Sequence, residues 1–268
     1  MSLEGIQSRR GIFAPLRTPP PTANAGLWIE KYAKALGGTG SPKEHFETLF
    51  SVLPDGRHRA PDLPAAYSAF FHRWRDHLGM LPPATIFARA SASGRLAVGL
   101  GAESTLETSI ALHHTYGVPY LPGSALKGLA AHAARERLDP AWNPEDPTGP
   151  YNVVFGRLEE AGFVTFHDAL WIPEGNDPRL PLDLDVMTVH HGDYYGAGKT
   201  PPTDWDDPNP IPFLSARGSY LLALTGPPGW IEKALEILTG ALAEDGLGAK
   251  TAAGYGRMKV TREEGVGR

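Results

Sequence analysis

The chain has 268 residues, enough for one large domain or two small ones, and its hydrophobic content of 41% is ordinary for a globular protein. No apolar run approaches the roughly 20 residues of a membrane span, residues 1–26 lack the apolar core of a secretory signal, and cysteine is absent. Disulfides and thiolate chemistry are therefore excluded, and we expect a cytoplasmic location. The net charge of −5 argues against a generic nucleic-acid binder.

The first 83 residues read as an arm followed by helices. Residues 1–26 contain arginines and a proline run, and a short helical pattern begins at Asn24 and ends at Gly37. Residues 43–53 and 64–78 also have helical patterns, the second with aromatic residues at intervals of three and four. We interpret this aromatic stripe as core packing rather than as a platform for stacking on bases.

From residue 84 onward the pattern alternates between strands and helices. Residues 173–212 contain eight prolines and many acidic residues, and we interpret them as an insertion with a hairpin around 185–191. The other elements that we expect are strands at 84–90, 96–100, 162–172, 213–224 and 254–261 and helices at 124–138 and 230–244. This order is that of a βαββαβ split motif, so the sequence predicts an α+β fold with a domain at 84–268 and an N-terminal extension at 1–83 packed on it.

The helix expected at 124–138 begins in the sequence Pro119-Tyr-Leu-Pro-Gly-Ser-Ala-Leu-Lys-Gly128, with Ser124 as its N-cap. Free backbone N–H groups at a helix start can hold anionic oxygens. Gly123, Ser124 and Lys127 lie in this first turn, which makes them candidate contacts to a polyanion.

A second candidate site is the glycine-rich segment Leu247-Gly-Ala-Lys-Thr-Ala-Ala-Gly-Tyr-Gly256, between a helical pattern and the last strand. A simple helix C-cap and turn would also contain glycine, but it does not require a lysine and a tyrosine among so many glycines. Backbone amides and cationic side chains can hold phosphates, and a tyrosine ring can stack on a base. The candidate residues are Gly248, Lys250, Thr251, Gly254, Tyr255, Gly256 and Arg257.

Charge is segregated along the chain. Residues 84–138 carry five basic and three acidic groups and residues 246–268 carry five and two, whereas residues 139–245 carry five basic and eighteen acidic groups. Both candidate sites thus lie on basic segments, which indicates a ribose-phosphate chain as the ligand. The acidic segment is either solvent-exposed surface or a face that meets a basic protein.

The histidines do not indicate a metal site. His113 and His114 are adjacent, as are His190 and His191, so on a strand the two members of each pair would face opposite ways. No zinc-binding spacing is present, and Gly198-Lys-Thr200 is not a P-loop because two prolines follow where a helix must begin. We expect no metal and no cofactor. These four histidines, with Tyr194 and Tyr195 on the 183–195 segment, are candidate RNA contacts, while plain loop packing is the alternative for that segment.

These motifs together resemble the RAMP superfamily. The stretch from Gly99 to Gly128 is similar to the opening half of such proteins, and residues 247–256 are similar to their C-terminal glycine-rich loop. Residues 185–195 and 24–32 resemble one branch, the family of sixth subunits of the Cmr complex, the type III-B CRISPR RNA-guided effector.

The resemblance implies a ferredoxin-like, RNA-recognition-like core with a thumb-like insertion. It also implies a non-catalytic backbone role in antiviral defence, in which the guide RNA is gripped near its 3′ region and the thumb reaches the duplex of guide and target. The implied partners are the guide CRISPR RNA, complementary target RNA, related RAMP backbone subunits and a small helical subunit. No catalytic residue is implied.

Two other functions remain open from the residues alone. One is a metal-independent endoribonuclease that matures guide RNA, with His113 or His114 as the acid–base group and Lys127 stabilising the phosphorane. The other is an assembly scaffold whose acidic 139–245 face binds a protein partner and touches no RNA.

Overall fold

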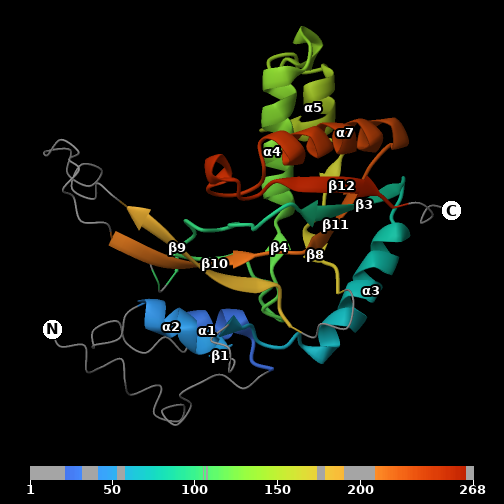
Figure 1. The fold of residues 1–268 in the computed structure, drawn as a ribbon. Coiled ribbons are helices and arrows are strands. Elements are labelled where there is room, and N and C mark those ends of the chain that lie inside the picture. The colour runs from blue at the N-terminus through green and yellow to red at the C-terminus, as the bar shows by residue number, and fades with distance from the viewer. Residues whose placement is uncertain are drawn as a thin grey trace, which may run out of the picture.

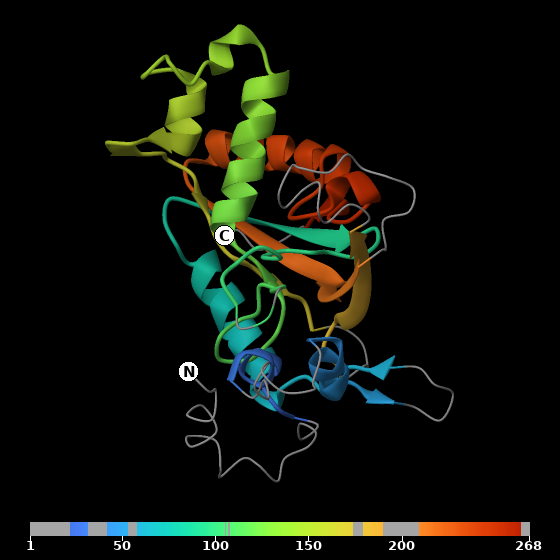
Figure 2. The ribbon, with the colours of Figure 1, turned by 90° about the vertical axis from the view of Figure 1, so that its left-hand side faces the viewer.

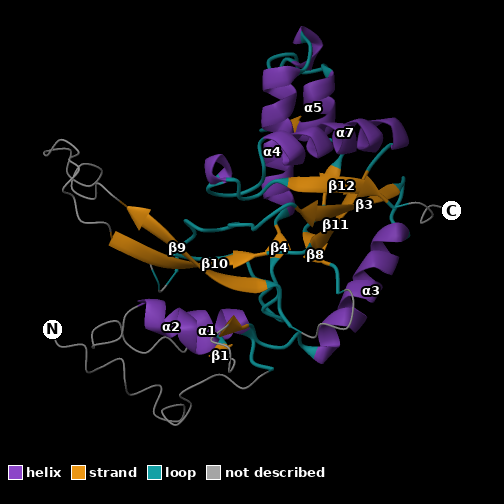
Figure 3. Cartoon of the chain, viewed as in Figure 1, coloured by secondary structure: helices purple, strands orange, loops and turns teal. Residues whose placement is uncertain are grey.

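The computed structural model describes residues 22–31, 42–52, 58–104, 106, 108–173, 179–189 and 209–263. The molecule is a mixed α/β structure built on an antiparallel sheet, with helices on both sides of the sheet and a separate hairpin beside it (Figures 1 and 3). The expected arm at 1–26 lies almost wholly outside the described residues.

The main sheet has the strand order β12-β3-β11-β8-β4, and every neighbouring pair is antiparallel. Its longest ladder runs from the pair Thr85 and Thr225 to the pair Ser91 and Ser219. The short strand β7 pairs with the end of β11. The strands are β3 (Thr85–Ala92), β4 (Tyr120–Leu121), β7 (Thr165–Phe166), β8 (Ala169–Trp171), β11 (Ser219–Thr225) and β12 (Met258–Arg262).

Two helices, α4 (Gly123–Arg137) and α7 (Pro228–Glu244), pack against each other and lie above the sheet in Figure 1. Helix α7 begins at a proline, where a missing amide hydrogen costs nothing, and its apolar residues recur every three or four positions. Their side chains are buried, as expected for a face that closes the core: Ile231, Leu235, Leu238 and Leu242. After α4 the chain forms a protrusion from η3 (Pro140–Trp142), α5 (Pro150–Phe155) and the small hairpin of β5 (Gly156–Arg157) and β6 (Glu160–Ala161).

Helix α3 (Ala65–Gly79) lies on the other side of the sheet and carries the aromatic stripe (Figures 1 and 2). Tyr67 is fully buried, its hydroxyl donates to the Trp171 carbonyl at 2.7 Å, and its ring contacts those of Phe70 and Tyr116. The stripe is therefore core packing, as the sequence predicts. The rest of the N-terminal part consists of α1 (Ala25–Lys31), α2 (Pro42–Leu49), β1 (Ser51–Val52) and β2 (His58–Arg59).

The 173–212 region contributes strand β9 (Leu182–Val189) and the first half of strand β10 (Asn209–Ala216) to a long hairpin. Strand β9 pairs antiparallel with β10 along its whole length, in a sheet of its own. Figure 1 shows this hairpin extending away from the main sheet. The connection at 190–208 lies outside the described residues, with His190, His191, Tyr194, Tyr195 and Gly198.

The structure corrects three strand predictions. The strand expected at 213–224 is two strands, because Gly218 turns the chain with a φ of +94° and sends β10 and β11 into different sheets. The strand expected at 162–172 is broken between β7 and β8, where Asp168 leaves the ladder to bond the start of α4. At 96–100 only Leu96 bridges another strand, and the chain then turns at Gly99, whose φ is +80°.

Candidate nucleic-acid interface

The glycine-rich segment forms a tight loop between α7 and β12. Four of its glycines have positive φ, and Lys250 is the only described non-glycine residue that does, with a φ of +61°. From Lys250 the chain forms one 3₁₀ turn, η4 (Thr251–Ala253), and leaves it at Gly254. We call residues 246–256 the glycine loop.

Some amides of the glycine loop are used to hold it in place. The Leu247 amide donates to the Gly256 carbonyl at 2.9 Å, the Ala249 amide to the Ala97 carbonyl at 2.8 Å, and the Gly256 amide to the Arg95 carbonyl at 2.9 Å. These bonds tie both ends of the loop to the chain that follows β3, so its shape is fixed by the fold.

Three consecutive backbone amides at the tip of the loop are not used to hold the loop in place. Within the described part of the chain, the N–H groups of Lys250, Thr251 and Ala252 have no hydrogen-bond acceptor. Lys250 and Thr251 are half-exposed and Ala252 is exposed. Successive free N–H groups beside a left-handed residue form a concave donor site that suits an anionic oxygen, and the Lys250 ammonium adds charge to it.

The other half of this region is the base of the β9–β10 hairpin, which touches the loop through Asp185. The Asp185 carboxylate accepts hydrogen bonds from the hydroxyls of Tyr255 and Ser215, both at 2.9 Å, and lies 2.5 Å from Nη1 of Arg95. Burial alone would raise the pKa of Asp185, but the hydrogen bonds from Arg95, Ser215 and Tyr255 outweigh it and hold that pKa below its usual range. We call these four residues the Asp185 cluster.

The side chains of the loop also meet an aromatic ring of the hairpin. The Tyr255 ring lies 5.9 Å from that of Phe213, and Nζ of Lys250 lies 5.7 Å from the centre of the same ring. Burial and the hydrogen bond to Asp185 raise the pKa of Tyr255, so its hydroxyl stays protonated as a donor. Tyr255, expected from the sequence as a candidate stacking residue, is thus already held by the hairpin.

The start of α4 is organised differently from the prediction. Ser124 is not the N-cap, because that position is occupied by Pro122, and the Gly123 amide donates to the Asp168 carboxylate at 2.7 Å. A side chain at Gly123 would overlap the Phe166 carbonyl, so this glycine permits close packing on β7. Ser124 is exposed and Lys127 is half-exposed, and neither side chain has a hydrogen bond or ion pair with a described residue.

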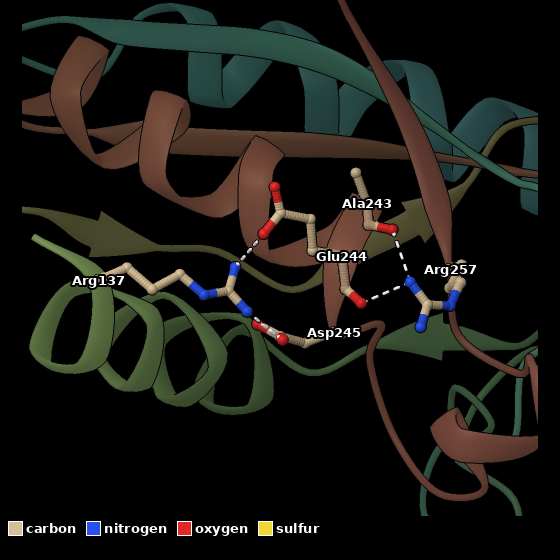
Figure 4. Close-up of polar contacts among 5 residues, drawn as sticks. All are labelled: Arg137, Ala243, Glu244, Asp245 and Arg257. Carbon is tan, nitrogen blue, oxygen red and sulfur yellow. Dashed lines mark hydrogen bonds and ion pairs between the residues drawn. The ribbon is translucent and has the colours of Figure 1, made fainter.

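The end of α7, directly before the glycine loop, lies next to the C-terminal end of α4. Arg137, in the last turn of α4, pairs with Glu244 at 2.7 Å and with Asp245, while Arg257 donates to the carbonyls of Glu244 and Ala243, the latter at 3.1 Å (Figure 4). The 15 residues of α4 span about 22 Å. The start of α4 and the residues that lead into the glycine loop are therefore near opposite ends of this helix, and no hydrogen bond or ion pair among the described residues joins the two candidate sites.

The two described histidines of the candidate set lie at a turn and not on a strand. His113 packs against the rings of Phe70 and Tyr116, each at 5.1 Å, and its Nδ1 accepts the Thr115 amide at 3.2 Å. Burial lowers the pKa of His113 despite the nearby Asp168. His114 is exposed. No cluster of three metal-ligating side chains is found among the described residues. The helices of this part of the chain also include none that could span a lipid bilayer.

Sequence reasoning located the glycine loop but missed Asp185, Arg95 and Asp168 as residues that shape the candidate sites. Asp185 lies in the 183–195 segment that was predicted to be part of the thumb. The only sequence signal for the orientation of its side chain is the alternating pattern of strand β9. Its partner Tyr255 is 70 positions away in the chain, a distance over which pattern gives no signal.

Comparison with known proteins connects these features to one family. The profile of the RAMP superfamily matches residues 89–259. A curated relative from Pyrococcus furiosus, described as CRISPR system Cmr subunit Cmr6, is 33% identical in an alignment covering 79% of this chain and 78% of the relative.

Two solved structures are also similar. A chain in the cryo-EM structure of the type III-B Cmr-beta complex bound to cognate target RNA matches with a TM-score of 0.57 at 20% identity. That match covers 74% of this chain and 66%, slightly under two thirds, of the other chain. The crystal structure of Cmr6 from Pyrococcus furiosus matches with a TM-score of 0.44 at 33% identity, covering 66% of this chain and 97% of the other.

Proposed function

Since this chain belongs to the RAMP superfamily and, within it, to the family of Cmr6 subunits, we propose that it is a non-catalytic RNA-binding backbone subunit of a type III-B CRISPR effector complex. In this role it acts in the cytoplasm in antiviral defence and holds guide CRISPR RNA near the 3′ region of the guide. It also contacts the duplex of guide and complementary target RNA. Its protein partners are the other Cmr subunits, namely related RAMP backbone subunits and a small helical subunit.

The observation that carries the RNA-binding proposal is the exposed tip of the glycine loop. Its three free amides and the Lys250 ammonium offer hydrogen bonds and charge to a phosphate, but nothing there distinguishes one base from another. Such a site grips a sugar-phosphate backbone whatever its sequence, which is what a subunit that holds guides of many sequences requires.

We further infer that residues 84–268 form a ferredoxin-like domain with residues 1–83 as its extension. The elements β3, α4, β8, β11, α7 and β12 follow one another as βαββαβ, and the strand order β12-β3-β11-β8 sets the fourth, first, third and second of its strands side by side. These facts support the assignment. The β9–β10 hairpin, inserted before β11, is then the thumb that reaches the guide–target duplex.

A non-catalytic role is supported by the surroundings of the histidines. An acid–base group in RNA cleavage must reach the 2′-hydroxyl or the leaving oxygen. His113 instead packs among aromatic rings, and its Nδ1 is occupied by the Thr115 amide.

The test is guide retention by the reconstituted complex over a series of salt concentrations. Lys250→Gln keeps the backbone of the loop and removes the charge, and Lys127→Gln does the same at the start of α4. Each should make the negative slope of log affinity against log salt shallower by about 0.7, the value for one lost phosphate contact on a single strand. Because no contact among the described residues joins the two lysines, their effects should add in the double variant.

The matched control is Lys233→Gln. Lys233 lies on α7 and pairs with Glu236 at 2.9 Å, so its loss removes a cation of the same kind that belongs to neither candidate site. If Lys250→Gln and Lys127→Gln both retain guide with the wild-type slope, the proposed contacts are wrong.

A further inference from the structure

The Asp185 cluster joins three segments that are far apart in the chain. Asp185 and Ser215 belong to the facing strands β9 and β10, Arg95 follows β3, and Tyr255 lies in the glycine loop. Arg95 is bound at both ends, because its guanidinium meets Asp185 while its carbonyl accepts the Gly256 amide at 2.9 Å. One carboxylate thus links the base of the hairpin to both the side chain and the main chain of the loop.

The electrostatics of the cluster make the link strong. The Asp185 side chain is only 19% exposed and accepts from three donors, one of them charged. Hydrogen bonds to an ionised acceptor are roughly twice as strong as neutral ones. Replacing the carboxylate by an amide would leave one neutral acceptor oxygen where two charged oxygens now accept from Arg95, Tyr255 and Ser215, so the loss falls on the loop and the hairpin together.

A second contact places the hairpin against the residue that offers charge to a phosphate. Phe213 on β10 lies against the Tyr255 ring and under the Lys250 ammonium. A shift of the hairpin base relative to the loop would change the position of Nζ of Lys250. The pose of the hairpin and the grip of the loop are therefore parts of one contact network.

We propose that Asp185 is a positioning residue that couples the β9–β10 hairpin to the glycine loop, so that an RNA backbone held on the loop also fixes the orientation of the hairpin. This inference rests on the proposed function, in which the loop holds guide RNA and the hairpin reaches the guide–target duplex. By reciprocity, a duplex that fixes the hairpin tightens the hold of the loop on the guide.

The experiment compares Asp185→Asn with Asp183→Asn in the full-length chain, alone and in the reconstituted complex with guide RNA. Asp183 is the matched control, because it lies two positions away on β9 and pairs with Arg217 at 3.4 Å rather than with the loop. The readouts are hydrogen exchange at 209–216 and 248–256 and guide retention against salt. Tyr255→Phe, which removes one hydrogen bond and keeps the charge pair, serves if Asp185→Asn does not fold.

In the wild type and in Asp183→Asn, guide binding should slow exchange in both segments. In Asp185→Asn, guide binding should still slow exchange in the loop but should no longer slow it at residues 209–216. Guide retention should weaken about fivefold. The salt slope should stay at the wild-type value, because no phosphate contact is removed. Tyr255→Phe should show the same pattern more weakly.

The inference is overturned if guide binding slows exchange at residues 209–216 as much in Asp185→Asn or Tyr255→Phe as in the wild type. It is also overturned if Asp183→Asn behaves like Asp185→Asn. A changed salt slope in Asp185→Asn would also overturn it, because the residue would then affect the number of phosphate contacts. The proposed function fails separately, when Lys250→Gln and Lys127→Gln leave guide retention unchanged.

Discussion

Two glycines of the glycine loop allow the cost of a close main-chain approach to be separated from the cost of an unusual backbone conformation. Gly254 and Gly256 have similar positive φ angles, +91° and +79°. A Cβ at Gly254 would meet no atom within 4 Å. At Gly256 it would overlap the carbonyl oxygen of Leu247 and lie 2.7 Å from the amide nitrogen of that residue.

The free-energy cost of Gly254→Ala is therefore only that of holding a non-glycine residue at a positive φ. A left-handed non-glycine residue costs about 1–2 kcal/mol, and the stiffer unfolded chain offsets about 0.4–1 kcal/mol of it. Gly256→Ala adds steric strain of about 1–3 kcal/mol against a backbone that cannot move freely, because Leu247 is buried. It also disturbs the bond from the Leu247 amide to the Gly256 carbonyl, worth about 1 kcal/mol. We expect a loss of stability of about 1 kcal/mol for Gly254→Ala and about 3 kcal/mol or more for Gly256→Ala.

The assay is thermal and urea unfolding of the two variants beside the wild type. At about 2–4 °C per kcal/mol for a domain of this size, Gly254→Ala should lower Tm by about 2–4 °C and Gly256→Ala by about 6–12 °C. Equal shifts for the two variants would refute the claim that Gly256 is required for close approach to Leu247.

The remaining predictions concern pH and the end of α7. Burial lowers the pKa values of His113 and His167, so the unfolded chain binds more protons below about pH 6.5, and the free energy of unfolding should fall as pH drops through that value. Urea titrations at pH 7.5 and pH 5.5 should show this loss, and His113→Gln should reduce it; equal stability of the wild type at both pH values would contradict the assignment. Arg257→Gln should cost about 1 kcal/mol, because the guanidinium then no longer caps the carbonyls at the end of α7. The control in the same urea assay is the exposed ion pair of Arg262 with Glu232, because Arg262→Gln should cost less than about 0.5 kcal/mol. Equal losses of stability in the two variants would show that the capping hydrogen bonds of Arg257 add nothing.

The elements that sequence predicts well are those whose signals are local. Helix α7 has a proline at its start and apolar residues at helical spacing, and α3 has its aromatic stripe, so both were found with near-correct ends. The strand break at Asp168 depends on a tertiary contact. Asp168 leaves its strand to bond an amide 45 positions earlier in the chain, which no periodicity reveals.

The candidate sites follow the same rule. The glycine loop was predicted because a left-handed turn needs glycines, and these are visible in the sequence. The capping role of Ser124 was predicted wrongly because a serine at a helix start is usually a cap, whereas here Pro122 takes that position and a distant carboxylate bonds the first amide. The contacts proposed for His190, His191, Tyr194 and Tyr195 lie outside the described residues.

The left-handed backbone of Lys250 bears on how this protein can evolve. A glycine at this position would relieve about 1 kcal/mol of conformational strain. Selection for thermal stability alone should therefore favour glycine over lysine there. Such a replacement would remove the ammonium beside the three open amides. Selection for stability and selection for ligand retention thus oppose each other at this one position. Proteins adapted to heat must gain their stability at other positions in order to keep the lysine.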